Sequence, residues 1–149
     1  CENNQWQAFV HRRETMHRDH VSERAASYGM EGATVDGNDV LAVQRAALEA
    51  AERVRAGGRP FLLETYTYRS RGHFEPDDQA YVDAAERAAW LARDPIDLAR
   101  RRLIESGRLS AAAADALERR VRDHLAAALA YAEASPYPDA AEMLTDVYA

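Results

Sequence analysis

The stretch that decides the fold runs from Pro60 to Asp78: Pro-Phe-Leu-Leu-Glu-Thr-Tyr-Thr-Tyr-Arg-Ser-Arg-Gly-His-Phe-Glu-Pro-Asp-Asp. Its first part, residues 61–66, has the apolar and aromatic character of a strand that is at least half buried. A polar loop follows, with two arginines, one histidine and three acids. A strand that delivers a charged, glycine-containing loop is where α/β proteins usually place function. A solvated surface loop is the alternative interpretation of the same composition.

The residues before this stretch alternate between helical and strand patterns. The predicted elements are a loop over residues 1–8, a helix over 22–28, a strand over 33–35 and a helix over 40–56. Ser22 is the predicted N-cap of the first helix and Gly29 its end, and Asn38 or Asp39 caps the second. This alternation is typical of a parallel sheet with helical crossovers. Because such sheets are buried on both faces, we expect partner strands outside these residues.

After the loop the chain becomes helical and rich in alanine. The predicted helices cover residues 78–91, 96–106, 111–134 and 140–144. Pro95 suits a first helical turn, and Ser110 suits the N-cap of the long helix. We expect the apolar tail over residues 145–149 either to dock or to fray. The chain therefore divides into an α/β portion over residues 1–78 and a helical extension over residues 79–149.

Composition narrows the function classes. The 149 residues are 47% hydrophobic and 30% charged, as in one globular domain or a piece of a larger one. A net charge of −6 disfavours nucleic acid or an anionic membrane as the main partner. The single cysteine, Cys1, suits a reducing compartment, so we expect a cytoplasmic protein. Because the chain opens on Cys1 and not on methionine, we expect an upstream portion that is missing, cleaved or a separate chain.

Two groups of residues near the start are candidate metal ligands. The side-chain amide of Asn4 and the carbonyl of Trp6 would supply two of the six oxygens that Mg²⁺ prefers. A simple Asn-Asn turn is the alternative. His11, His17 and His20 lie close together in the sequence and could bind a metal, but no apolar pattern fixes them. A surface loop is the favoured interpretation of that segment.

The loop after residue 66 holds the candidate catalytic group. His73 follows Gly72, which leaves the backbone free to aim the imidazole. Arg69 and Arg71 flank it and favour an anion such as diphosphate. A neutral imidazole beside a diphosphate could donate a hydrogen bond or pass a proton. Asp77 and its neighbour could pair with the arginines to order the loop, although surface pairs contribute only about 0–1 kcal/mol.

Several motifs resemble one family when taken in order. They are Glu2-Asn3-Asn4, Ala25-Ala26-Ser27-Tyr28-Gly29, Val35-Asp36-Gly37-Asn38-Asp39-Val40, Thr67-Tyr68-Arg69-Ser70-Arg71-Gly72-His73, Arg93-Asp94-Pro95-Ile96 and Thr145-Asp146-Val147-Tyr148. Over essentially its whole length the chain resembles the C-terminal half of the α subunit of thiamine-diphosphate-dependent 2-oxo acid dehydrogenases. That group includes the pyruvate, branched-chain and acetoin enzymes. The resemblance implies part of a parallel-sheet thiamine-diphosphate-binding domain, followed by a helical extension that packs on it and on partner subunits in an α₂β₂ assembly.

The resemblance also implies roles for individual residues. Asn4 would bind Mg²⁺ through its side chain and Trp6 through its carbonyl, and both would lie at the cofactor. His73 matches the catalytic histidine at the cofactor diphosphate, which helps to transfer the acyl group to lipoamide. Arg69 would contact the cofactor site. The residues that order the loop match Tyr68, Arg69 and Asp77. The Gly-Asp-Gly end of the family's metal motif is not in this chain.

The implied reaction is decarboxylation of a pyruvate-like 2-oxo acid, or cleavage of acetoin. The acyl group would pass to a lipoyl acyltransferase, and the other partners would be a β subunit and the N-terminal α portion. Phe74 stands where the mitochondrial members of the family carry a phosphorylated serine. In this respect the chain resembles bacterial acetoin enzymes instead. Residues 7–13 depart from the common Ala-Ile-Ser-Thr-Pro pattern and leave the substrate open. A non-catalytic assembly module and a carboligase that does not use lipoamide are the alternatives, and we expect this chain alone to be inactive.

Overall fold

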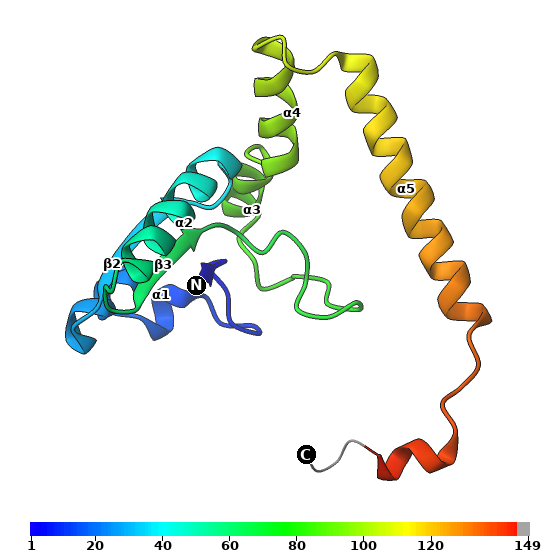
Figure 1. Ribbon diagram of the computed structural model, residues 1–149, viewed down its shortest axis with the longest axis horizontal. Coiled ribbons are helices and arrows are strands. Elements are labelled where there is room, and N and C mark those ends of the chain that lie inside the picture. Colours follow the sequence, from blue (N-terminus) through cyan, green and yellow to red (C-terminus); the bar gives the residue numbers. More distant parts are fainter. Residues whose placement is uncertain (146–149) are drawn as a thin grey trace. The chain divides into compact units, whose positions relative to one another are not determined.

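A three-stranded parallel sheet in the order β1-β3-β2 lies at the centre of the N-terminal part of the chain (Figure 1). The computed structural model describes residues 1–145. The strands are β1 (Glu2–Asn3), β2 (Glu31–Asp36) and β3 (Phe61–Tyr66). Asn3 and Asp36 both pair with Tyr66, so the carboxyl ends of all three strands meet at one edge of the sheet. The predicted α/β class with a partial parallel sheet is confirmed.

Strand β1 lies in the segment that we predicted to be a loop, so that prediction is wrong. Two residues are too few to show an alternating pattern, and the strand is defined by its partner. Thr65 N–H donates to the carbonyl of Cys1 (2.8 Å), and Thr67 N–H donates to the carbonyl of Asn3 (2.9 Å). The start of the chain therefore becomes a strand because it pairs with the free edge of β3.

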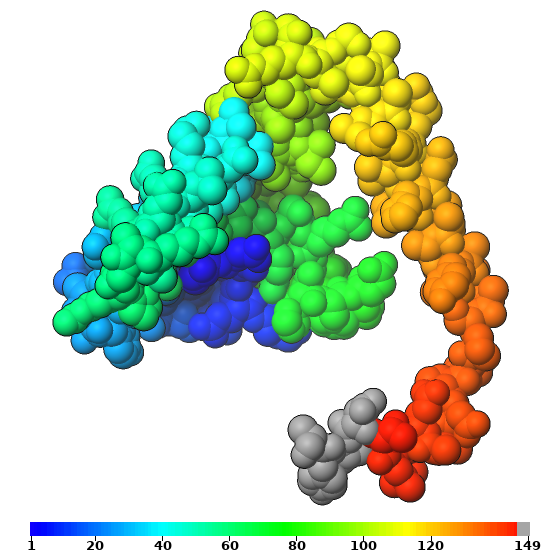
Figure 2. Space-filling model, viewed as in Figure 1, coloured from blue at the N-terminus to red at the C-terminus, as the bar shows by residue number. Residues whose placement is uncertain are grey.

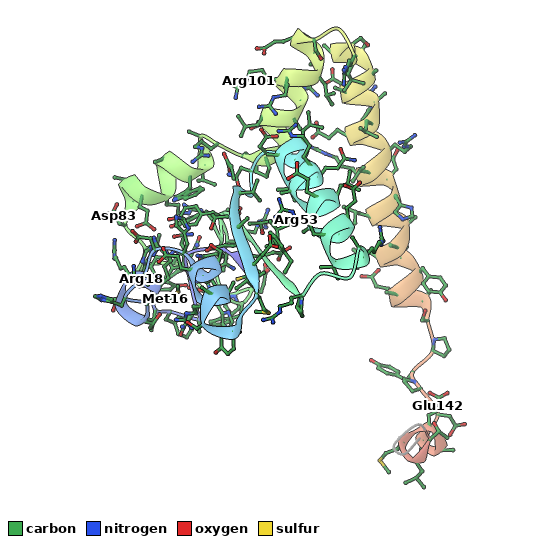
Figure 3. The ribbon with its side chains drawn as sticks, turned by 60° about the vertical axis from the view of Figure 1, so that its left-hand side comes forward. Met16, Arg18, Arg53, Asp83, Arg101 and Glu142 are labelled. Carbon is green, nitrogen blue, oxygen red and sulfur yellow. The ribbon has the colours of Figure 1, made fainter. Side chains whose placement is uncertain are left out.

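The helical elements are α1 (Arg12–Thr15), the 3₁₀ helix η1 (Val21–Tyr28), α2 (Val40–Arg55), α3 (Ala84–Leu91) and α4 (Pro95–Glu105). From η1 onward the helices and strands follow the predicted order, whereas α1 lies in a segment that was predicted to be a loop. Gly29, at φ 64°, ends η1 as predicted. The Asp39 carboxylate caps α2 by accepting from two backbone N–H groups of its first turn. Arg53, near the end of α2, pairs with Glu31 at the start of β2, which ties the helix to the sheet (Figure 3).

The start of η1 differs from the prediction that Ser22 is its N-cap. His20 occupies the N-cap position and makes no side-chain capping bond. The Ser22 hydroxyl instead lies 2.7 Å from the Thr34 hydroxyl, and its backbone N–H donates to Glu64. The hydrogen-bonding groups of Ser22 therefore find their partners on strands β2 and β3 and not in the helix.

Helix α3 begins at Ala84, six residues later than the pattern predicted. The side chains of Asp77 and Asp78 accept from the N–H groups two residues ahead of each, and such turns compete with helix formation. Gln79 adopts a positive φ of 57°. Asp83 then caps the helix by accepting from Glu86 N–H at 2.7 Å (Figure 3).

The chain separates into two compact units, Cys1–Glu105 and Ser106–Ala149. Helices α3 and α4 thus group with the sheet, and the domain boundary after residue 78 stays a prediction. An ion pair of 2.6 Å between Arg93 and Asp36 is one contact that holds them there. The second unit contains α5 (Ala111–Ala134), capped by Ser110 as predicted, and the 3₁₀ helix η2 (Ala140–Leu144). The tail over residues 145–149, which we expect either to dock or to fray, lies outside the described residues beyond Thr145.

No helix within residues 1–145 is long and apolar enough to cross a membrane.

Candidate functional site

The two predicted metal ligands lie on one turn at the carboxyl end of β1. The Oδ1 atom of Asn4 accepts a hydrogen bond of 3.0 Å from the backbone N–H of Trp6. Gln5, between them, has a positive φ of 73°. The turn therefore places a side-chain oxygen and a backbone segment side by side at the edge where α/β sheets bind ligands.

Gln5 is held in this left-handed conformation by its own buried side chain. It is 3% exposed. Its Nε2 donates to the carbonyls of Asn3 (3.0 Å) and Thr67 (3.2 Å), and its Oε1 accepts from Arg12 Nε (2.6 Å). A residue with a Cβ in this conformation costs roughly 1–2 kcal/mol. The hydrogen bonds offset that cost and fix the turn between the two candidate ligands.

Glu64, in the middle of β3, is a fully buried carboxylate with 0% exposure. Oε1 accepts from Asn3 Nδ2 (2.5 Å), and Oε2 accepts from Ser22 N–H (3.0 Å) and Thr34 Oγ1 (2.8 Å). Burial would raise the pKa of Glu64, but these hydrogen bonds and one from Val21 N–H outweigh it and lower the pKa to about 2. The sheet therefore contains an ionised group that is satisfied by donors from several elements.

Arg69 joins the loop after β1 to the loop after β3. Its guanidinium donates to the carbonyls of Gln7 (2.7 Å) and Ala8 (2.8 Å) and lies 6.0 Å from the ring of Trp6. Its backbone N–H donates to the carbonyl of Asn4 (3.0 Å). The structure thus brings Asn4, Trp6 and Arg69 together. We call Asn4 and Trp6, the two candidate Mg²⁺ ligands, the half-site, and Arg69 orders the loop that follows it. The contact of Arg69 with a cofactor stays a prediction.

The His73 loop is ordered by Asp77. The Asp77 carboxylate accepts from His73 N–H (2.6 Å), from the Tyr81 hydroxyl (2.7 Å) and from Gln79 N–H (3.0 Å). Burial acts to raise the pKa of Asp77, but these donors prevail and lower it. Gly72 approaches so closely that an added Cβ would lie 2.6 Å from Asp77 Cβ. Hydrogen bonds donated to the Asp77 carboxylate, in place of the ion pair that we considered, therefore order the loop.

The imidazole of His73 is exposed and lies beside the loop that follows β1. Its ring centre is 6.0 Å from that of Phe9, which also contacts Phe74 (6.2 Å) and Tyr81 (5.5 Å). Figure 2 shows the N-terminal residues in blue against this green loop. The half-site and the candidate catalytic histidine thus belong to neighbouring loops at the same edge of the sheet.

His11 was predicted to lie in a surface loop, and that prediction is wrong. The residue is 6% exposed, and its Nδ1 accepts from Arg13 N–H (3.1 Å) at the start of α1. Its Nε2 lies 3.5 Å from a carboxylate oxygen of Glu86. Burial lowers the pKa of His11 despite that carboxylate. Within residues 1–145 no cluster of three His, Cys, Asp or Glu side chains could hold a metal, so the three-histidine site is not formed.

Asn38 fixes the part of the edge that follows β2. Its side chain is buried, donates to the carbonyl of Arg93 (2.7 Å) and accepts from the Thr67 hydroxyl (2.7 Å). Tyr68 stacks on Trp90 with ring centres 5.4 Å apart, and burial raises the pKa of its hydroxyl. These side chains line a cavity of about 160 Å³. Tyr68 therefore braces the start of the loop against α3, in agreement with its predicted ordering role.

The sequence matches a known family model. The model of the dehydrogenase E1 component covers residues 1–141. The chain belongs to this family. The alpha subunit of acetoin:2,6-dichlorophenolindophenol oxidoreductase from Bacillus subtilis is 45% identical over 131 residues, which are 87% of this chain and 39% of that protein. The family prediction made from the motifs is confirmed.

Pyruvate dehydrogenases are also among the relatives. The chloroplastic pyruvate dehydrogenase E1 component subunit alpha-3 of Arabidopsis thaliana is 36% identical over 148 residues, or 99% of this chain and 35% of that protein. The corresponding alpha subunit of Rhizobium meliloti is 39% identical over 127 residues, or 85% and 36%. The chain thus spans little more than a third of the length of these relatives of the E1 family.

Three groups at the site escaped prediction from the sequence. Glu64 carried a signal, because an acid inside an apolar strand is rarely buried without partners. Gln5 and His11 carried none, since each reads as an ordinary polar residue of a loop. Their burial follows from the way the chain folds back between β3 and α3.

Proposed function

We propose that this chain is part of the α component of a thiamine-diphosphate-dependent dehydrogenase that acts on acetoin or a pyruvate-like 2-oxo acid. Membership of the E1 family and the names of the relatives support this class. One observation supports roles for individual residues. The Asn4–Trp6 turn and the His73 loop lie side by side at the carboxyl edge of the sheet, and Arg69 joins them.

The half-site fits Mg²⁺ in its chemistry. Asn4 offers a neutral amide oxygen and Trp6 a carbonyl, both hard ligands of the kind that Mg²⁺ accepts. The Asn4 oxygen is already oriented along the turn by Trp6 N–H. Because Mg²⁺ requires six oxygens, the remaining ligands would come from the cofactor diphosphate and from the N-terminal α portion.

His73 would act at the diphosphate end of the cofactor. Thiamine diphosphate, when bound, supplies the carbanion chemistry, and the protein supplies position and electrostatics. The His73 imidazole, exposed on a loop that Asp77 holds, can donate a hydrogen bond to a phosphate oxygen and hold a proton there. Arg69 keeps the neighbouring loop in place. The acceptor of the acyl group would be a lipoyl group on an acyltransferase.

Three further features belong to the same proposal. The active assembly would combine this chain with the N-terminal α portion and a β subunit. Acetoin is the substrate suggested by the Bacillus subtilis relative, and a pyruvate-like acid by the others. A cytoplasmic location belongs to the proposal as well, and its ground is the single cysteine of the sequence, which suits a reducing compartment.

Replacing His73 by alanine in the assembled protein tests the proposal. We expect acyl transfer to lipoamide to fall by about 10²–10⁴-fold, the usual contribution of a positioned acid or base. Binding of thiamine diphosphate, measured by calorimetry, should weaken less than transfer does, because His73 supplies one hydrogen bond to the diphosphate, and binding of Mg²⁺ should change little. His17→Ala, at another exposed histidine, is the matched control and should leave transfer unchanged. Unchanged transfer in the His73 variant would refute its proposed role.

A further inference from the structure

We propose that Glu64 is a positioning residue for the magnesium half-site, acting through Asn3 and Gln5. This inference rests on the proposed function and adds a buried residue of the central strand to it. Glu64 touches neither candidate ligand. Its effect would reach Asn4 and Trp6 along a buried chain of hydrogen bonds.

The chain of contacts is continuous. Glu64 Oε1 accepts from Asn3 Nδ2 (2.5 Å), and the carbonyl of Asn3 accepts from Gln5 Nε2 (3.0 Å). Asn3 Oδ1 also lies 3.4 Å from both the backbone nitrogen and the side-chain nitrogen of Gln5. All three residues are buried, with exposed fractions of 0% for Glu64, 7% for Asn3 and 3% for Gln5. Gln5 is the left-handed residue directly between Asn4 and Trp6.

The hydrogen bond between Asn3 and Glu64, which we call the anchor, matters because β1 is so short. Two residues form the strand, and few backbone hydrogen bonds join it to β3. A slip of one residue would turn every side chain of a strand to the opposite face. The bond from Asn3 to Glu64 links side chains across the two strands, so it fixes the register that sends Asn4 and Trp6 to the carboxyl edge.

The polarity of the anchor is also fixed. Both oxygens of Glu64 face donors, with Asn3 on one side and Ser22 N–H and Thr34 on the other. A glutamine at position 64 would turn its NH₂ group toward a donor. Rotation of the Asn3 amide would not relieve this, because its NH₂ group would then face the nitrogens of Gln5. An aspartate at position 3 would accept from both neighbours.

Because Asn3→Asp reverses the hydrogen bond that Glu64→Gln disrupts, the double variant should restore what each single variant loses. Glu64→Gln, Asn3→Asp and the double variant are prepared in the full α chain, assembled with its β subunit. Mg²⁺ is titrated calorimetrically into each protein in the presence of saturating thiamine diphosphate. Glu52→Gln, at an exposed position of α2, is the matched control for the change from acid to amide.

We expect each single variant to bind Mg²⁺ about 10–100-fold more weakly, as is usual when a residue that orients a metal ligand is changed. The double variant, which reverses the hydrogen bond and keeps the net charge, should return to within a few-fold of the wild type. Urea denaturation of each assembled variant separates the two roles, because a merely structural role of Glu64 would lower the free energy of unfolding and leave the Mg²⁺ affinity of the folded assembly unchanged. If the single variants do not assemble, the Mg²⁺ affinity of the assembled double variant decides: affinity within a few-fold of the wild type supports the inference, and affinity that stays about 10–100-fold weaker contradicts it.

Two results would overturn it. Wild-type affinity in Glu64→Gln, or a double variant no better than the single ones, would show that Glu64 does not position the half-site, while leaving the proposed function in place. Absence of Mg²⁺ binding by the wild-type assembly would instead refute the proposed function, and this inference with it.

Discussion

The ionisation of Glu64 should make the stability of the chain depend on pH in a way that can be isolated. Its pKa falls from the ordinary 4.5 to about 2 in the folded protein. Because the folded pKa is depressed, the stabilisation is complete above pH 4.5 and is lost as the pH falls toward 2. The difference corresponds to about 3 kcal/mol, of which about 1.4 kcal/mol is lost by pH 3.5.

Comparison with Glu64→Gln isolates this contribution. Other carboxylates titrate in both proteins and cancel in the difference, whereas glutamine carries no charge at any pH. We expect the difference in the free energy of unfolding, measured by urea denaturation, to shrink by about 1.4 kcal/mol between pH 6 and pH 3.5. A difference that stays constant over this range would show that hydrogen bonds do not hold Glu64 ionised, and would refute the account of the buried carboxylate.

Two further substitutions probe the edge of the sheet. Gly72→Ala would place a Cβ 2.6 Å from Asp77 Cβ and 2.7 Å from its carbonyl oxygen, so we expect a displaced loop and slower acyl transfer to lipoamide. Ser70→Ala, in the same loop, is the control, and equal transfer rates in the two variants would contradict the steric argument. Asn38→Ala removes two buried hydrogen bonds and should lower the free energy of unfolding by about 2–4 kcal/mol in urea denaturation. Thr67→Val removes one of the two and should cost less; an equal or larger loss would argue against this assignment.

Much of the framework was predictable because it depends on local chemistry. Strand β3 follows from an apolar run between a proline and a polar loop, and its bounds agree with the prediction. Helix α5 begins after Ser110 and ends at Ala134, as the predicted range has it. Gly29 ends η1 because a residue without a Cβ adopts a positive φ at little cost.

The remainder depended on contacts between distant residues. β1 exists because β3 offers it an edge 60 or so positions away in the sequence. Residues 78–83 do not continue α3, although their pattern predicts a helix. The side chains of Asp77 and Asp78 accept from backbone N–H groups two residues further along, and these local bonds compete with helix formation. His11 is buried because α3 packs beside it with Glu86.

The sequence by itself determined the family, the order of helices and strands from η1 onward, and the motifs that carry Asn4, Trp6 and His73, because these features depend on residues close together in the chain. Only the tertiary structure decided that Glu64 is buried and ionised, that Gln5 holds the turn between the candidate ligands, and that Arg69 donates to the loop after β1. Each of these facts depends on where the partner donors and acceptors lie in space. Burial removes water from those groups, and their hydrogen bonds to distant residues then set both charge and geometry.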